Sequence, residues 1–218
     1  MEKKQRGPWE DKRLRDRIRP GVGVLFVGIN PGLRSALTGH HFAGFSNRFW
    51  KLLYESGLVP EPITYQDDAR LPAWGYGITN IVPRATAGID GLRPHEFHAG
   101  AEVLLRKIRR YRPAIVAVVG VTVWRALLEA WGDREARSRS IALGAQHPER
   151  IVAPGFVAAL PLRTQFFVLP NPSGRNANYS YEEMLSAFRS LRVVSRRLQL
   201  AKLENGGIAK SRMAKLRT

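Results

Sequence analysis

The chain has 218 residues, which is enough for one α/β domain with a well-developed core and short tails. It contains no cysteine, which excludes disulfides, thiolate chemistry and iron–sulfur clusters. The formal net charge of +17 favours nucleic acid as the partner, because basic side chains that neutralise phosphates release counterions; an anionic membrane surface is the second candidate. No apolar run reaches the roughly 18 residues of a membrane span and the N-terminus is charged, so we expect a soluble, cytoplasmic protein with no membrane partner.

Predicted strands and helices alternate along the chain. The pattern predicts, in order, a strand over 24–29, a helix between Ser46 and Gly57, a strand over 76–82, a helix from Pro94 to before Pro113, a strand over 114–120, a helix over 121–131, a strand over 166–170 and a helix beginning at 180–183. Continuous apolar strands separated by amphipathic helices indicate an α/β fold with three layers, in which helices cover both faces of a mostly parallel sheet.

Both ends of the chain are basic. Residues 1–20 and 199–218 are predicted to be mobile tails, and the residues between them show no internal repeat and no low-complexity linker. We therefore expect a single domain over 21–198, and a monomer.

Two loops with small polar residues follow predicted strands. The sequence GINPGLRS follows the first strand, and NPSGRNANYS follows the last. Asn-Pro and Pro-Gly are common turn pairs, so either loop alone has a purely structural interpretation. Ligands of parallel sheets bind beyond the carboxyl ends of the strands, however, and two such loops at two strand ends favour a binding site.

The sequence has no recognisable motif for binding a nucleotide cofactor or a metal. Gly21 and Gly23 precede the first strand, whereas the glycines of a dinucleotide fingerprint follow it, and the chain has no Gly-Lys-Ser/Thr triplet of a phosphate-binding loop. His95 and His98 stand in the first turn of a predicted helix without a carboxylate pattern, so a solvated helix start is the better interpretation than a metal site. We expect no metal and no cofactor.

Three segments carry a family resemblance. GINPGLRSALTGHHFAGFSNRFWKLLYESGL, GITNIVPRAT and VLPNPSGRNANYS resemble, in this order, the motif regions of the thymine-DNA glycosylase and mismatch-specific uracil-DNA glycosylase family, within the uracil-DNA glycosylase superfamily. The similarity extends over roughly residues 21–195. It implies a uracil-DNA glycosylase-like fold and base excision repair. In that reaction the N-glycosidic bond of a uracil or thymine is hydrolysed after the base has flipped out of a G·U or G·T mispair in double-stranded DNA.

The resemblance gives Asn30 the catalytic role of positioning the attacking water. An amide is too weakly basic to act as a general base, but it can orient a water by hydrogen bonds. That is sufficient if the sugar becomes oxocarbenium-like and the base leaves as an anion. No lysine stands at this position, so we expect a monofunctional enzyme that leaves an abasic site.

The resemblance also implies a base pocket. Ile29 and the loop after it would supply backbone groups, and Ser35 would lie near the water. Phe42 would stack on the flipped base, with ordinary core packing as the alternative. His41 and Asn80 match pocket residues of the thymine-excising branch, and the alternative for His41 is a surface loop histidine.

The second loop would bind DNA through Asn171, Ser173, Gly174, Arg175 and Asn176. It departs from its relatives, which commonly carry an arginine three residues after the glycine. Here Arg175 directly follows Gly174 and occupies the position of an apolar wedge. Arg175 is therefore a candidate to fill the gap left by the flipped base, with a simple phosphate contact as the alternative.

Two rival functions stay open at this stage. The first is a catalytically silent nucleic-acid-binding module on the same fold, and the second is a basic RNA-binding protein whose tails carry the binding. The base preference is also open among uracil, thymine, hypoxanthine, xanthine and ethenocytosine. If the protein is bacterial, we expect it to associate with the nucleoid.

Overall fold

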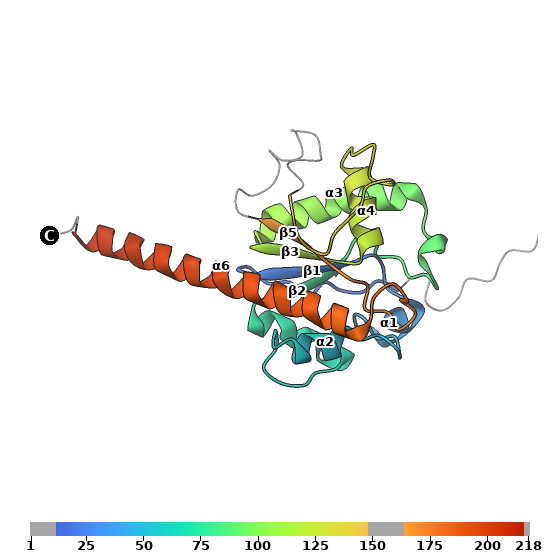
Figure 1. Ribbon diagram of the computed structural model, residues 1–218, viewed down its shortest axis with the longest axis horizontal. Coiled ribbons are helices and arrows are strands. Elements are labelled where there is room, and N and C mark those ends of the chain that lie inside the picture. The colour runs from blue at the N-terminus through green and yellow to red at the C-terminus, as the bar shows by residue number, and fades with distance from the viewer. Residues whose placement is uncertain (1–11, 148–163, 216–218) are drawn as a thin grey trace, which may run out of the picture.

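A computed structural model describes residues 12–147 and 164–215, with side chains placed up to Ala201 (Figure 1). A five-stranded sheet in the order β2-β1-β3-β5-β4 forms its middle layer. The strands are β1 (Val24–Gly28), β2 (Tyr76–Asn80), β3 (Ile115–Val119), β4 (Gly144–Gln146) and β5 (Gln165–Leu169). Only β4, at one edge, runs antiparallel to its neighbour. The predicted fold class, a mostly parallel sheet flanked by helices, is confirmed.

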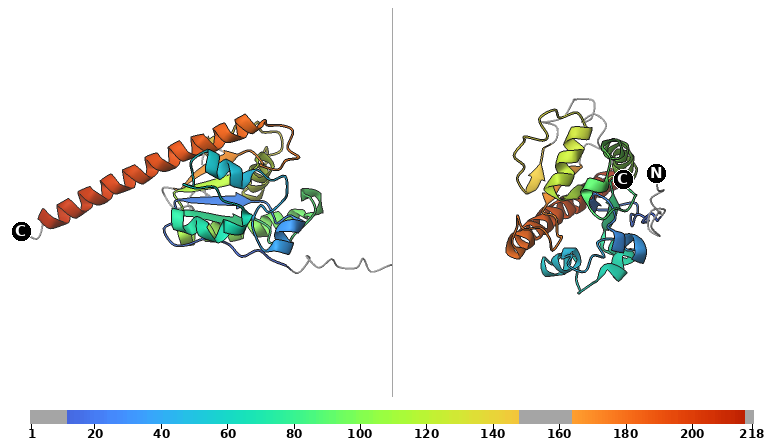
Figure 2. Two further views of the ribbon diagram at one scale, coloured as in Figure 1. Left: turned by 90° about the horizontal axis from the view of Figure 1, so that it is seen from below. Right: turned by 90° about the vertical axis from the view of Figure 1, so that its right-hand side faces the viewer.

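The helices cover both faces of the sheet, as Figures 1 and 2 show. They are α1 (Leu33–Thr38), α2 (Phe49–Glu55), α3 (Pro94–Tyr111), α4 (Val121–Ala130) and α6 (Tyr181–Lys215), with 3-10 turns η1 (Tyr65–Trp74) and η2 (Ile89–Gly91). Helices α2 and α6 pack on one face, and α3 and α4 pack on the other.

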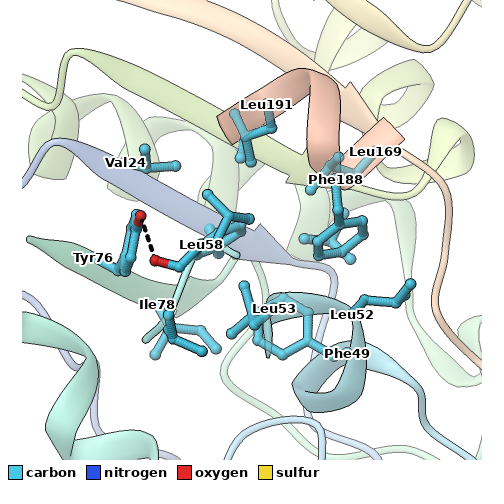
Figure 3. Packing of buried hydrophobic residues seen from close by; sticks show 14 of the residues in the cluster. Val24, Phe49, Leu52, Leu53, Leu58, Tyr76, Ile78, Leu169, Phe188 and Leu191 are labelled. Atoms are coloured by element: carbon cyan, nitrogen blue, oxygen red, sulfur yellow. Dashed lines mark hydrogen bonds between the residues drawn. The ribbon is translucent and has the colours of Figure 1, made fainter. Parts of the chain in front are cut away.

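The two central strands are buried on both faces, which explains their continuous apolar sequences. Because side chains alternate along a strand, Val24 and Phe26 of β1 point to the α2/α6 side while Leu25 and Val27 point to the α3/α4 side. Figure 3 shows the first of these two cores, in which the Tyr76 hydroxyl donates to the Leu58 carbonyl oxygen at 2.9 Å.

Part of the predicted N-terminal tail is paired with the sheet. Arg17 exchanges two 3.0 Å backbone hydrogen bonds with Ile78 of β2, and Arg13 forms an antiparallel bridge with Arg84. Residues 12–19, here called the N-terminal segment, thus run along the open edge of β2 and cover it. At the other end of the chain, α6 continues as a helix beyond residue 199 and projects past the sheet (Figure 2).

Four elements were not predicted from the sequence: α1, η1, η2 and β4. Strand β4 has only three residues, too few to produce an alternating pattern. The η1 turns begin at Thr64, whose side chain forms a capping box with Asp67, and they contain Pro72, which a continuous α-helix would disfavour.

Candidate active site

A cavity of about 240 Å³ lies at the carboxyl ends of the parallel strands. Pockets for drug-sized ligands measure roughly 300–1,000 Å³, so this one suits a group the size of a single ring. The described residues that line it are Leu14, Gly28, Ile29, Asn30, Pro31, Gly32, Ser35, Phe42, Gly44, Ser46, Asn47, Asn80, Val119, Val123, Asn171, Ser173 and Arg175.

The cavity brings together most of the site residues predicted from the sequence, and both predicted loops contribute to its wall. His41, Gly174 and Asn176 do not line it, and each supports a residue that does. The predicted residues on the wall are Ile29, Asn30, Ser35, Phe42, Asn80, Asn171, Ser173 and Arg175.

The Asn30 side chain is held in one orientation. Its Nδ2 donates to the Pro31 carbonyl at 3.2 Å, the Arg84 carbonyl at 3.0 Å and the Thr86 Oγ1 at 2.7 Å. Carbonyl oxygens can only accept, and the Thr86 hydroxyl gives its own proton to the Gly88 carbonyl at 2.6 Å. The amide nitrogen must therefore face this loop, and Oδ1 is left as the acceptor that Asn30 offers to the cavity.

The loop that holds Asn30 is fixed in turn to α3. Two nitrogens of the Arg84 guanidinium donate to the Glu96 carboxylate at 2.8 and 2.7 Å, and one of them also donates to the Gly91 carbonyl. Glu96 accepts a further bond from the Arg93 backbone N–H at the start of α3. The hydrogen bonds from Arg84 are the main cause that lowers the pKa of Glu96 to about 2.

Asn80 is oriented through His41. The His41 ring is 2% exposed, which excludes the surface-loop interpretation, and its Nε2 lies 3.1 Å from the Arg15 carbonyl oxygen. Because that oxygen can only accept, Nε2 carries the proton and Nδ1 is an acceptor, 3.4 Å from the Asn80 Nδ2. Burial lowers the pKa of His41, although the Arg15 hydrogen bond and the charge of Asp68 oppose the shift. Asn80 thus keeps its Oδ1 for the cavity.

Gly28 makes this arrangement possible. A Cβ atom at this position would lie 2.6 Å from the Asn80 Oδ1 and 3.3 Å from the Phe42 Cζ. Any larger residue at the end of β1 would displace the Asn80 amide.

A buried carboxylate holds the histidine loop against the N-terminal segment. Asp68 is fully buried, and its Oδ1 accepts from the Arg17 Nε at 3.2 Å and lies 3.1 Å from the His40 Nδ1. Its Oδ2 accepts from the His41 backbone N–H at 3.2 Å. Three donors thus satisfy a charge that would be costly to bury alone.

Phe42 lies in the cavity wall and also packs on the core. Its ring stacks on Phe49 with centroids 4.2 Å apart and an interplanar angle of 23°. Its φ of 51° is rare for a residue other than glycine and has to be maintained by its surroundings. Ser35 contributes by accepting the Ala43 backbone N–H at 3.0 Å.

The loop of residues 171–178, here called the wedge loop, is organised by its own polar side chains. Asn171 Oδ1 accepts from the Ser173 N–H, and Asn176 donates to the Asn171 carbonyl oxygen at 2.8 Å. Gly174 is required by close approach, since a Cβ there would lie 2.5 Å from the Ser46 Cβ. Arg175 is exposed, and its side chain makes no hydrogen bond or ion pair with a described residue.

The sequence did not indicate every contributor. Thr86 closes the quoted segment GITNIVPRAT but carries no chemical signal of its own. Leu14 belongs to the segment expected to be a tail, and nothing in its composition indicates a pocket wall. Asn47 lines the cavity and accepts the Phe49 N–H at 2.9 Å where α2 begins, a role that a helix-start pattern could have suggested.

The chemistry available at the cavity is that of amides, hydroxyls and backbone groups. None of the described residues that line it is acidic. Within the described ranges, no group of three or more His, Cys, Asp or Glu side chains could hold a metal ion, and no helix has the length and apolar character to span a membrane. Such a site can orient a water and bind the polar edge of a ring, but it offers no carboxylate base.

The chain matches a known protein family over most of its length. The family model of the uracil DNA glycosylase superfamily matches residues 16–192. The matched span begins inside the N-terminal segment and ends within α6, so it contains every residue of the cavity except Leu14.

Proposed function

Since the chain belongs to the uracil DNA glycosylase superfamily, whose activity is the hydrolysis of a base from DNA, we propose that it is a monofunctional glycosylase for uracil in G·U mispairs. Thymine in G·T mispairs is the weaker substrate. The product is an abasic site, which initiates base excision repair. That the enzyme is monomeric, cytoplasmic and independent of metals and cofactors stays our prediction.

The orientation of Asn30 carries this proposal. A water that donates to the Asn30 Oδ1 is held with its own lone pair directed at the sugar C1′. The water oxygen bonds to C1′ as the N-glycosidic bond breaks, and the bonding electron pair leaves on N1 of the base. The attacking water then gives up one proton, which neutralises the anionic base directly or through solvent, and C1′ keeps a hydroxyl. Because bond breaking leads, little basicity is needed, and an oriented water is sufficient. The backbone at Ile29 and beyond would stabilise the anionic base.

Asn80 explains the choice of base. Its Oδ1 accepts from the N3–H of uracil or thymine, whereas N3 of cytosine carries no proton and would leave that oxygen unpaired. A buried polar group without its partner costs about 1–3 kcal/mol, which amounts to roughly 5- to 150-fold discrimination. The methyl group of thymine needs additional room in a cavity of about 240 Å³, so uracil is the better substrate.

Arg175 is the candidate wedge. Its alkyl stem can fill the space that the flipped base leaves, and its guanidinium can donate to acceptors of the opposite guanine. A side chain that makes no hydrogen bond or ion pair with the described residues is available for this insertion.

Single-turnover release of uracil from a G·U duplex tests the proposal. Asn30→Ala should lower the rate by about 10²–10⁴ while DNA binding survives. Asn30→Asp should be equally slow although aspartate is the better base, because its carboxylate would face the Pro31 and Arg84 carbonyls. Asn178→Ala, an exposed asparagine on the wedge loop, is the matched control.

The outcomes separate the alternatives. No release by the wild-type protein would favour the silent nucleic-acid-binding module. Release by Asn30→Ala within threefold of wild type would remove Asn30 from the mechanism. An active Asn30→Asp would show that a general base, and not an oriented amide, is what the position needs.

A further inference from the structure

Phe45 is the most exposed large hydrophobic side chain among the described residues. Its side chain is 89% exposed, and the next, Val193, reaches 66%. A single exposed apolar residue needs no explanation by itself, so its position decides whether it has a function.

Phe45 lies in the chain between two residues of the cavity wall. Its chain neighbours Gly44 and Ser46 both line the cavity, and Ser46 packs directly on Gly174 of the wedge loop. Phe45 and Arg175 are therefore exposed side chains on two segments that are in contact and that both contribute to the cavity wall.

The Phe45 ring is held in its exposed position. The Arg34 guanidinium lies 3.5 Å from the ring centroid, and Arg34 also donates to the Tyr65 hydroxyl at 3.3 Å. Phe45 and Ser46 are the central residues of a turn that the Asn47 N–H closes by donating to the Gly44 carbonyl at 3.0 Å. A cation–π contact of this kind fixes the ring without covering it, since most of its surface stays in water.

We propose that Phe45 stacks on a nucleobase adjacent to the flipped nucleotide when DNA binds, as a second inserted residue beside Arg175. The proposal rests on the proposed function. Every nucleobase presents a flat π face, so stacking by an aromatic ring is strong without being sequence-specific. Arg175 would fill the gap that the flipped base leaves. Phe45 would replace the stacking that the adjacent base loses when the flipped base departs.

Affinity for a duplex that contains a tetrahydrofuran abasic-site analogue tests this without requiring catalysis. We expect Phe45→Ala to bind at least fivefold more weakly, at the lower end of what losing one base–aromatic stack costs. Phe45→Leu should lie between alanine and wild type, and Phe45→Trp should bind within twofold of wild type. Leu200→Ala, an exposed apolar residue on α6, is the control, and thermal unfolding of each variant should match wild type because the ring is exposed.

Two further measurements sharpen the test. In Phe45→Trp, duplex binding should quench indole fluorescence beyond the change seen with the native tryptophans. Arg34→Gln should weaken binding less than Phe45→Ala, because it releases the ring but does not remove it.

Several results would overturn the proposal. One is that all Phe45 variants bind the abasic-site duplex within twofold of wild type. Another is that Phe45→Trp binds as weakly as Phe45→Ala, which would mean that only the loop shape matters. If the variants lose as much affinity for undamaged duplex as for the abasic-site duplex, Phe45 contacts DNA away from the flipped nucleotide. If the wild-type protein releases no uracil while the order Trp, Phe, Leu, Ala persists, the proposed function falls and the stacking role of Phe45 stands.

Discussion

The two walls of the cavity are built in opposite ways. On one side, Asn30 is held by three acceptors, and the loop that supplies two of them is fixed to α3 through Arg84 and Glu96. On the other side, the wedge loop bonds mainly within itself, and Arg175 has no side-chain partner among the described residues. One wall orients a group with high precision, and the other presents a side chain to solvent.

This difference matches the demands of the proposed reaction. A water that attacks without a strong base has to be placed accurately, and accuracy comes from hydrogen bonds that exist before the substrate arrives. A residue that enters a DNA helix has to leave solvent and adapt to its new surroundings. Bonds to the protein would oppose this movement. We call the Asn30 side of the cavity the rigid wall and the wedge-loop side the exposed wall. Substitutions that loosen the rigid wall should therefore lower the rate of base release on any substrate. Substitutions in the exposed wall should lower it mainly on duplex DNA.

Among the residues that hold Asn30 in place, Thr86 should have the largest effect when its acceptor oxygen is removed. Thr86→Val deletes the oxygen that accepts from Asn30 at 2.7 Å while it keeps the side-chain shape. We expect single-turnover uracil release to slow by about 10- to 100-fold, because a misplaced catalytic group costs up to 10²-fold, with unchanged DNA affinity. Thr86→Ser keeps the hydroxyl and should stay close to wild type. An active valine variant would mean that the two carbonyls alone hold Asn30.

The exposed wall should respond differently. Arg175→Ala should slow uracil release from duplex DNA at least tenfold more than release from single strands, because only a stacked helix leaves a hole to fill. Arg175→Leu should recover part of the loss by restoring the apolar body of the wedge. Equal slowing on both substrates without recovery by leucine would instead indicate a phosphate contact.

Sequence patterns were sufficient for the framework of the site. Apolar runs at 24–29 and 114–120 located the central strands, and the loops after the first and last strands both reached the cavity. What the patterns could not provide is the partner of each polar side chain. Thr86 reaches Asn30 across 56 positions, and the carbonyl of Arg15 fixes His41 although a backbone oxygen has no sequence signature. Leu14 was missed because pairing with the β2 edge outweighs the basic composition of its segment.

The buried histidine should make stability depend on pH. His41 has a pKa below its ordinary value of 6.5, so the unfolded chain binds a proton at a higher pH than the folded protein does. Stability from this residue is complete above pH 6.5 and declines as the pH falls below it, by at most about 1.4 kcal/mol per pH unit. The charges of Asp68 and Asp16 oppose this lowering of the His41 pKa, whereas the charge of Arg17 adds to it. Urea unfolding from pH 8 to 5 should show a shallower decline for His41→Gln, whereas His98→Gln on α3 should follow wild type.

The smallest effect is expected at Glu96, which pairs with Arg84 and so supports the loop that holds Asn30. Glu96→Gln removes the charge that pairs with Arg84 but keeps one acceptor oxygen, so we expect about 0.5–1 kcal/mol less stability at pH 7 and a rate within about threefold of wild type. The folded-state pKa of Glu96 is lowered to about 2 from 4.5, so its contribution is present above pH 4.5 and is lost as the pH falls toward 2. The stability difference between the glutamine variant and wild type should therefore be constant from pH 5 to 8 and should narrow below pH 4.5. Paired unfolding curves across this range would measure it. A difference that persists unchanged to pH 2.5 would mean that packing of the side chain, and not its charge, supports the Arg84 loop.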